Sequence, residues 1–152
     1  MLKYSLMNVK IVSTPIGFFN SIYSSSGLQR LTFLGKKKSQ HTKDKELQKL
    51  LDEFFSTNGL NIMPNIDLHG SHFQLKVWSA LCDIPRGKTM SYSLVANQIG
   101  TPGAARAVGT ACKLNPIPLF IPCHRVVKQD RSIGQFGLGI EHKRYLLELE
   151  RV

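Results

Sequence analysis

The chain has 152 residues, of which 42% are hydrophobic and 20% charged. This length and composition allow a self-sufficient core and exclude an intrinsically disordered protein. No apolar run approaches the roughly 20 residues that span a bilayer, and the first residues lack the apolar core of a secretion signal, so we expect no membrane association and a cytoplasmic location, on the nucleoid if the host is prokaryotic. Twenty Lys and Arg against ten Asp and Glu give a net charge of +10, which favours a polyanionic partner, nucleic acid before an anionic membrane.

The first half of the chain predicts a β-meander followed by one helix. Residues 9–13, 18–24 and 28–34 are short β-branched or aromatic runs separated by turn sequences. Residues 44–57 carry apolar side chains at helical spacing, and residues 58–70 are typical of a linker. We therefore expect a small N-terminal α/β domain over residues 1–70, with the lysines of residues 36–38 in a solvated loop.

The second half, residues 71–152, predicts a mainly helical domain. A helix is expected over residues 73–82, and Ser91 is placed to cap another that Gly100 ends. Thr101 and Pro102 predict the start of a third helix that runs to about Leu114. Two short helices joined by a tight turn on a basic protein indicate a helix-turn-helix.

Arg106 stands alone among the small residues of that third helix. Gly and Ala on a helix face either pack closely against a neighbour or allow the backbone to approach a phosphate chain. Arg106 is accordingly either an ordinary surface arginine or a cation that reaches into a duplex.

The chemical centre of the sequence is Cys123, which interrupts the apolar run of residues 117–127 together with His124 and Arg125. A free Cys in such a run is commonly a small buried hydrophobe. A neighbouring imidazole or guanidinium, however, lowers the pKa of a thiol and makes it a nucleophile. Cys82 and Cys112 lack such neighbours and are expected to pack on helices, and three unpaired cysteines favour a reducing compartment.

Two features of this centre stay open at the level of sequence. Adjacent residues of a regular strand point to opposite faces, so His124 can assist Cys123 only across a local bend or a water molecule. The imidazole also needs an orienting carboxylate, and the downstream candidates are Asp130, Glu141, Glu148 and Glu150. The last two lie on a helix expected over residues 141–151, with Tyr145, Leu146 and Leu149 facing the core.

The segment from residue 121 to 127, Ile-Pro-Cys-His-Arg-Val-Val, is preceded by Asn-Pro-Ile-Pro at 115–118, Ala-Ala-Arg-Ala-Val-Gly at 104–109 and Ser-Tyr at 91–92. It is followed by the glycine loop 134–139 and by residues 143–150. In this order and spacing the motifs closely resemble the O6-alkylguanine-DNA alkyltransferases, over residues 73–150. The first 70 residues are similar more weakly. The resemblance implies an α+β protein with a ribonuclease-H-like N-terminal domain and a winged-helix-like C-terminal domain.

The resemblance also implies a single-turnover DNA repair reaction. Cys123 is expected to accept the alkyl group, His124 to take the thiol proton through a water, and Glu150 to orient the imidazole. Asn115 would support the turn before the active-site segment, and Tyr92 would donate toward the purine. Arg106 would fill the place that the flipped base leaves in the stack. The other implied DNA contacts are Tyr92, Gln74, Ser93, Thr101, Ala104 and Gln129. The implied residues of the substrate pocket are Pro122, Val126 and Gly137.

No cofactor and no metal are expected, and the protein is expected to act as a monomer on double-stranded DNA that carries O6-alkylguanine. The zinc site of several family members should be missing, because the first cysteine is Cys82. Gly137-Leu138-Gly139 replaces a Gly-Gly pair of many relatives, which bears on pocket shape. The non-repairing alkyltransferase-like proteins carry Trp at the position of Cys123, so a binding-only role is disfavoured.

Two other classes remain as alternatives. The first is a helix-turn-helix module that binds DNA without chemistry. The second is a cysteine hydrolase that uses Cys123 and His124, although such hydrolases need an oxyanion hole and turn over repeatedly.

Overall fold

The computed structural model of the protein describes residues 8–56 and 62–151. The chain divides into two compact units, Met1–His69 and Gly70–Val152, where the sequence suggested a boundary after residue 70. The expected helix end at Thr57 and the first part of the expected linker lie outside the described residues, as does the N-terminal segment 1–7. Within the described residues, no helix combines the length and apolar character that a membrane span needs.

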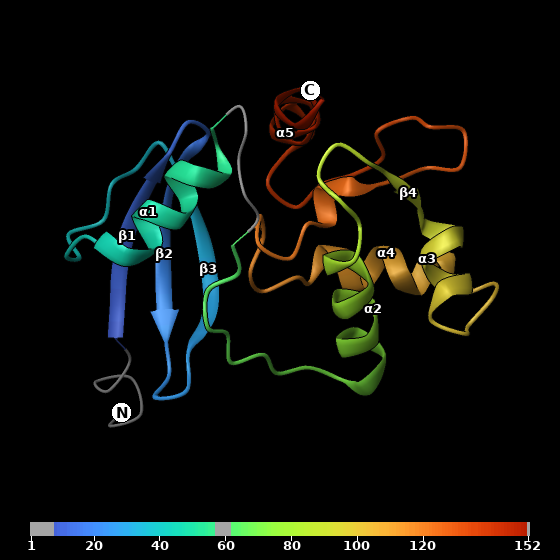
Figure 1. Ribbon diagram of the computed structural model, residues 1–152, viewed down its shortest axis with the longest axis horizontal. Helices are drawn as coiled ribbons and strands as arrows, with labels where there is room; N and C mark the ends of the chain where they lie inside the picture. Colours follow the sequence, from blue (N-terminus) through green and yellow to red (C-terminus); the bar gives the residue numbers. More distant parts are fainter. Residues whose placement is uncertain (1–7, 57–61, 152) are drawn as a thin grey trace. The chain divides into compact units, whose positions relative to one another are not determined.

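The first unit is an antiparallel three-stranded sheet with one helix against it (Figure 1). Strands β1 (Asn8–Thr14), β2 (Gly17–Tyr23) and β3 (Leu28–Gly35) follow one another as a meander, and α1 (Lys45–Phe54) covers one face. The mixed α+β class predicted from the sequence is therefore confirmed. The buried apolar side chains of this unit are Ile11, Val12, Ile16, Phe19, Leu28, Leu31, Leu47, Leu51 and Phe54.

A buried carboxylate joins the sheet to the helix. Asp44 caps α1 by accepting a hydrogen bond from the Leu47 backbone N–H at 3.1 Å, and it also accepts bonds from Ser21 Oγ at 2.8 Å and from the Tyr23 hydroxyl. Burial of the phenol, with Asp44 beside it, raises the pKa of Tyr23 above its usual value. These bonds offset the desolvation of the carboxylate, so a polar residue is stable in this core.

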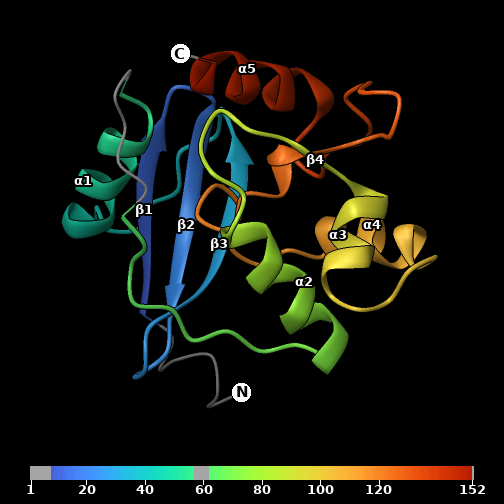
Figure 2. The same cartoon turned by 45° about the vertical axis from the view of Figure 1, so that its right-hand side comes forward.

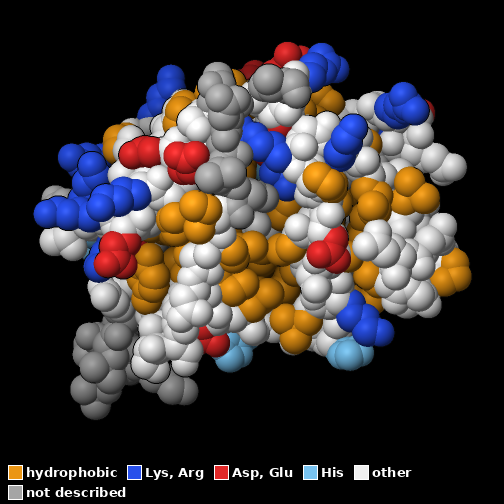
Figure 3. Space-filling view, in the orientation of Figure 1, with side chains coloured by type: hydrophobic (Ala, Val, Ile, Leu, Met, Phe, Trp, Pro, Cys, Tyr) orange, Lys and Arg blue, Asp and Glu red, His pale blue; other side chains and the backbone are white. Residues whose placement is uncertain are grey.

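The described part of the expected linker is tied to the sheet. The Leu28 N–H donates to the Asn65 carbonyl at 2.9 Å, and the Asp67 N–H donates to the Leu28 carbonyl at 2.9 Å. The prediction of a linker from composition was therefore wrong for residues 65–67, because backbone hydrogen bonds to a strand edge do not require apolar side chains. Lys36, Lys37 and Lys38 are exposed as expected, and Figure 3 shows Lys and Arg side chains gathered at the left of the view, where Figure 1 places the loop after β3.

The second unit contains α2 (His72–Cys82), β4 (Met90–Ser91), α3 (Tyr92–Gln98), α4 (Ala105–Lys113), the 3-10 turn η1 (Cys123–Arg125), β5 (Val126–Val127) and α5 (Ile140–Glu150). Helices α3 and α4 lie side by side in both ribbon views (Figures 1 and 2). The two short strands β4 and β5 pair in parallel. Trp78 of α2 donates from Nε1 to the Ala111 carbonyl of α4 at 2.9 Å, which fixes α2 against α4 inside the core.

Capping explains where these helices start. The Ser91 side chain accepts from the Leu94 N–H at the start of α3, as the sequence indicated. At α2, Ser71 and Gln74 form a capping box that the sequence analysis did not predict. The predicted start of the next helix at Thr101 and Pro102 was wrong. Thr101 Oγ1 donates back to the Ala96 carbonyl at 3.3 Å, and α4 begins only at Ala105. Gly103 has φ of +86°, so the chain makes a turn between α3 and α4 instead of a first helical turn.

Candidate active site

The segment that carries Cys123 is bent before the cysteine is reached. The Ile121 N–H donates to the Ile117 carbonyl at 3.0 Å, and Leu119 at the apex has φ of +76° although it is buried. Asn115 holds both sides of this turn, because its amide donates to the Ile121 carbonyl at 2.7 Å and its oxygen accepts from the Ile117 N–H at 2.9 Å. Left-handed backbone at Leu119 costs about 1–3 kcal/mol, and these hydrogen bonds offset that cost.

Cys123, His124 and Arg125 form the 3-10 turn η1 and do not continue a strand. The difficulty that adjacent strand residues point to opposite faces therefore does not arise. The Cys123 N–H donates to the Ile121 carbonyl at 2.8 Å, and the Arg125 N–H donates to the Pro122 carbonyl at 3.0 Å. Only the two residues that follow, Val126 and Val127, are extended, and they pair with β4.

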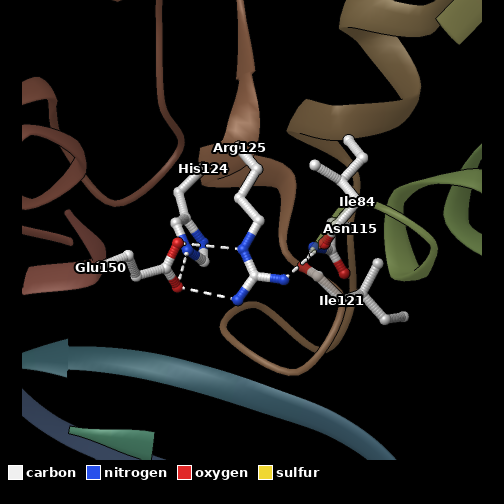
Figure 4. A network of polar contacts seen from close by, with 6 residues as sticks. All are labelled: Ile84, Asn115, Ile121, His124, Arg125 and Glu150. Carbon is white, nitrogen blue, oxygen red and sulfur yellow. Dashed lines mark hydrogen bonds and ion pairs between the residues drawn. The ribbon is translucent and has the colours of Figure 1, made fainter. Parts of the chain in front are cut away.

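Behind this turn, one carboxylate binds two side chains (Figure 4). Glu150 Oε1 lies 2.8 Å from His124 Nε2 and accepts from Arg125 Nη2 at 2.9 Å, while Oε2 accepts from Arg125 Nε at 3.0 Å. The remaining guanidinium nitrogen, Nη1, donates to the Ile84 carbonyl at 2.7 Å. All three charged or titratable side chains are buried, so the network joins η1, α5 and the loop after α2 in the core of this unit.

The carboxylate that contacts the imidazole is thus Glu150. Glu148 is 64% exposed and is paired at 3.4 Å with Arg151, which is 79% exposed. Burial raises the pKa of Glu150, but the hydrogen bonds from His124 and Arg125 outweigh it and bring the pKa to about 2. For His124 burial is the larger influence and lowers its pKa, although Glu150 acts in the opposite direction. The site therefore contains an ionised carboxylate and, at neutral pH, an uncharged imidazole.

The pKa of the Cys123 thiol is shifted in the direction opposite to the one expected from the sequence. We expected His124 and Arg125 to lower its pKa, but burial raises it, and the Asn115 amide, the Lys143 ammonium and nearby backbone N–H groups only partly oppose that effect. Arg125 does not assist because its guanidinium faces Glu150 and the Ile84 carbonyl. Cys123 is 6% exposed, so a protonated thiol presents a small edge to the exterior.

That edge opens into a pocket of about 850 Å³. The pocket brings together four of the residues predicted from the sequence: Tyr92, Arg106, Cys123 and Gly137. Three cations, Arg106, Lys113 and Lys128, are among its lining residues, which include no carboxylate. A pocket with a thiol inside and positive charge around it suits a substrate attached to a polyanion. The other lining residues are Ala105, Gly109, Thr110, Cys112, Gln135 and Phe136.

Tyr92 forms one wall of this pocket. A Cβ on Gly109 would lie 3.8 Å from the Tyr92 ring, and one on Gly134 would lie 3.3 Å from its hydroxyl. The contact at Gly109 is an ordinary van der Waals distance, whereas the absence of a side chain at Gly134 allows its loop to approach the phenol closely. Burial raises the pKa of Tyr92 to about 12, so the phenol is protonated and can donate a hydrogen bond.

The other predicted residues lie outside the pocket lining. His124, Asn115 and Glu150 lie around the turn that carries Cys123, and Pro122 and Val126 are buried beside it. Gln129 is exposed, whereas Ser93, Thr101 and Ala104 are half-buried on and between α3 and α4. Gln74 has a structural task, because its side chain closes the capping box of α2.

Sequence reasoning missed Lys143 and placed Tyr145 wrongly on the buried face of α5. The buried residues of α5 are Lys143, Leu146 and Glu150, while Tyr145 is 43% exposed. The spacing of three and four residues between them is that of a single helix face. This spacing was the available signal, and it was overlooked because two of the three residues are charged. Cys112, expected to be a packing residue, lines the pocket, and burial raises its pKa to about 12.

The described residues contain no group of three or more His, Cys, Asp or Glu side chains arranged to hold a metal ion. His69, at the end of the first unit, lies 2.9 Å from the Asp67 carboxylate. The side chains of the site offer a thiol, a neutral imidazole that a carboxylate orients, and a phenol.

Comparison with known proteins places this architecture in a defined class. The family model of the 6-O-methylguanine DNA methyltransferase DNA-binding domain matches residues 72–152. The methylated-DNA--protein-cysteine methyltransferase of Methanosarcina barkeri is 37% identical over 95% of this chain and 97% of its own length. That of Mycobacterium tuberculosis is 48% identical over 66% of this chain, and the match spans 61% of the length of that relative.

Solved structures agree with the sequence comparison. Mycobacterium tuberculosis OGT in complex with DNA has a TM-score of 0.85 at 38% identity, over 94% of this chain and 92% of that one. The O6-methylguanine-DNA methyltransferase of Pyrococcus kodakaraensis has a TM-score of 0.61 at 26% identity. Fold and site together define an α+β protein with a buried thiol next to an imidazole that a carboxylate orients. The chain belongs to the O6-methylguanine DNA methyltransferase family.

The Glu150 network predicts how stability depends on pH. The pKa of Glu150 is about 2 in the folded protein against 4.5 for a free side chain, so its stabilisation is present above pH 4.5 and is lost as the pH falls toward 2. The lowered pKa of His124 acts in the same direction below pH 6.5. We expect Glu150→Gln to reduce the free energy of unfolding at pH 7 by about 3–5 kcal/mol, because Arg125 is left buried without its partner. The slope of stability against pH below 4.5 should also flatten.

Urea unfolding followed by fluorescence of Trp78, the single tryptophan, measures both effects. Glu148→Gln removes the same charge from the exposed face of α5 and should change stability by less than about 1 kcal/mol at any pH. Equal losses in the two variants would contradict a stabilising role of the buried network.

Proposed function

We propose that this protein repairs DNA by transferring the alkyl group of O6-alkylguanine to the sulfur of Cys123. The observation that carries the proposal is the position of Cys123, whose thiol edge faces a cation-lined pocket while the His124–Glu150 pair lies behind the same turn. Membership of the methyltransferase family supports the same reaction. The reacting carbon is buried in the base stack of a duplex, so the nucleotide must be flipped into the pocket.

The transfer is a single displacement. The sulfur attacks the alkyl carbon, the new S–C bond forms, and the bond from that carbon to O6 breaks. The thiol proton passes to His124 through a water, and the imidazolium is stabilised by the ionised Glu150, which lies 2.8 Å away. Guanine leaves with a negative charge on the base, and the Tyr92 phenol donates a proton or hydrogen bond toward it. The product is a thioether, which cellular thiol reduction does not reverse, so each molecule acts once and needs no cofactor.

The lowered pKa of His124 keeps the imidazole uncharged at neutral pH, whereas the raised pKa of Cys123 makes proton transfer from the resting thiol less favourable. An uncharged imidazole can accept a proton, whereas an imidazolium cannot. Asn115 supports the geometry by holding the turn between α4 and η1, and Gly137 offers a backbone N–H beside the pocket. Pro122 and Val126 complete the surroundings of the base.

We assign DNA binding to α3, the turn after it and α4, which act as a helix-turn-helix within a winged-helix-like second unit. The N-terminal unit is proposed to be ribonuclease-H-like. Arg106 is exposed at the start of α4 and lines the pocket, which suits a side chain that fills the stack when the base has left it. Ser93, Thr101, Ala104 and Gln129 are proposed to follow the phosphate backbone, and Gln74 to do so from the start of α2. Three free cysteines fit action as a monomer in the reducing cytoplasm.

The nucleophile is tested by intact-mass analysis after incubation with duplex DNA containing O6-methylguanine. Wild-type protein should gain one methyl group, mapped to Cys123, and a second addition of substrate should give no further turnover. Cys123→Ser should gain nothing yet keep its affinity for duplex DNA, because a hydroxyl is a poor nucleophile at neutral pH. The Cys82→Ser variant, changed at the C-terminal residue of α2, should transfer the methyl group normally. Methyl found on Cys112, or repeated turnover as in a hydrolase, would reject the assignment.

The relay is tested by the pH dependence of the single-turnover rate. Glu150→Gln removes the group that keeps His124 basic, so the imidazole should accept the thiol proton less readily and the profile should shift to higher pH with a rate at pH 7 at least about tenfold lower. Glu148→Gln should match wild type. Circular dichroism is measured first, so that the rates are compared only for folded variants. Unchanged profiles in both would mean that the thiol is activated without this carboxylate.

The role of Arg106 is tested by comparing duplex and single-stranded substrates. Arg106→Ala should slow transfer from a duplex by about tenfold or more and from a single strand much less, because a single strand has no vacated stack to fill. Arg144→Ala, which removes the same charge from an exposed position on α5, is the control. Equal losses on both substrates would indicate that Arg106 contributes only general electrostatic attraction.

A further inference from the structure

The first unit carries a strongly basic segment that the proposed reaction does not use. Six lysines lie within residues 36–49, and all six are exposed. We call them the lysine surface, and they are Lys36, Lys37, Lys38, Lys43, Lys45 and Lys49. Lys and Arg side chains gather at the left of Figure 3, where Figure 1 places the loop after β3. None of the six lines the pocket that contains Cys123.

No acid in the described part of the chain forms an ion pair with the lysine surface. Every ion pair found among residues 8–56 and 62–151 joins side chains outside residues 36–49. The segment has two carboxylates of its own, Asp44 and Glu46. Asp44 is buried and takes its hydrogen bonds inside the core, so only Glu46 lies at the surface. Like charges this close in the sequence repel one another, and a bound polyanion would remove that repulsion.

The backbone beneath the lysine surface is fixed to the sheet. Ser39 Oγ donates to Asn20 Oδ1 of β2 at 2.9 Å. Further along the chain, the Ile11 N–H of β1 donates to the Thr42 carbonyl, and the Asp44 N–H donates to the Ile11 carbonyl, both at 2.9 Å. The lysines therefore project from an ordered segment. A surface that is ordered before binding loses less conformational entropy when its partner binds.

The lysine surface continues from the loop onto α1. Lys45 and Lys49 are four residues apart, about 6 Å along the helix axis, on the exposed side of a helix that buries Leu47 and Leu51. Charges spread over a loop and a helix suit a chain of phosphates better than a single small anion. Lysine is also a compact point charge without the planar fork of arginine, so it suits phosphate contacts that do not read base sequence.

The lysine surface lacks the apolar side chains that other partners require. A protein interface has apolar or aromatic side chains at its centre, and a helix that binds a membrane surface inserts apolar side chains. Of the large apolar side chains that are exposed in the described part of the chain, none lies in residues 8–56. The surface therefore offers charge alone, which supplies essentially all of the sequence-independent binding to DNA.

We propose that the lysine surface is a second contact for nucleic acid, which binds the phosphate backbone of duplex DNA without regard to sequence. The proposed function assigns DNA binding to the second unit. This contact is additional to that one and requires no alkyl transfer. It holds the protein on undamaged DNA and thereby raises the concentration of nucleotides around the pocket.

Three double variants test the proposal at equal net charge. The loop variant is Lys37→Gln with Lys38→Gln, and the helix variant is Lys45→Gln with Lys49→Gln. The control, Lys88→Gln with Arg144→Gln, removes two exposed cations of the second unit. Each variant lowers the net charge of +10 by two. Circular dichroism is measured first, and the affinity of each folded variant for an undamaged duplex is then measured by fluorescence anisotropy over a series of salt concentrations.

We expect the plot of log affinity against log salt to become shallower by about 1–2 in the loop and helix variants, since each lost phosphate contact removes about 0.9 from the slope. Their affinity at about 0.15 M salt should fall roughly three- to tenfold, while the control keeps the wild-type slope. In the wild-type protein, acetylation by an N-hydroxysuccinimide ester, mapped by mass spectrometry, should slow at the lysine surface when duplex is added and stay unchanged at Lys88.

Equal slopes in all three variants would overturn the proposal in favour of general attraction by net charge, as would acetylation that the duplex does not slow. If the loop and helix variants lose binding to vesicles of phosphatidylserine and phosphatidylcholine but keep wild-type duplex affinity, the surface binds a membrane and the proposal is wrong. The duplex carries no lesion, so the result does not depend on the transfer chemistry. A wild-type protein that transfers no alkyl group would refute the proposed function and leave this test intact.

Discussion

The second unit depends on a single buried carboxylate. Glu150 neutralises Arg125 through two nearly equal hydrogen bonds and orients His124 through a third contact. Without it, a guanidinium with no exposed surface would be left in the core, which is among the costliest arrangements in a folded protein. The same group therefore determines whether the unit folds and which way the imidazole faces. Gly87, whose Cβ would come within 2.9 Å of the Glu150 carbonyl, allows the preceding loop to close over this end of α5.

Local sequence rules predicted those parts of the fold that local chemistry controls. The turn residues between the strands and the capping hydroxyl of Ser91 produced the elements that they predict. Thr101 carried the same signal and failed, because the glycines at 100 and 103 adopt left-handed backbone on either side of it and its hydroxyl turns back to Ala96. Whether a hydroxyl caps a helix depends on the backbone conformation of the residues around it, and the sequence alone does not give that conformation.

The candidate site shows the same division. Cys123 and His124 could be singled out from the sequence motif, and Glu150 only from the family resemblance. The charges around these residues could not be predicted. Arg125 was expected to act on the thiol because it is adjacent in sequence, and a 3-10 turn sends its side chain to Glu150 instead. Lys143 is 20 residues away from Cys123 in the sequence and lies near the site only because α5 lies against η1. Burial is the largest influence on the pKa values of Cys123, His124 and Lys143. It depends on tertiary packing and has no local sequence signature.

Burial also explains how an inert thiol and an available base can occur side by side. Desolvation disfavours charge of either sign, so it raises the pKa of Cys123 and lowers that of His124. The resting pair is then a neutral thiol and a neutral imidazole, and the reverse, a thiolate beside an imidazolium, is avoided. In the proposed reaction the nucleophile is used only once, so this state is an advantage, because a protonated thiol reacts slowly with oxidants and stray electrophiles. We expect the proton to be removed only when an alkyl carbon occupies the pocket and the developing negative charge can pass to the departing guanine.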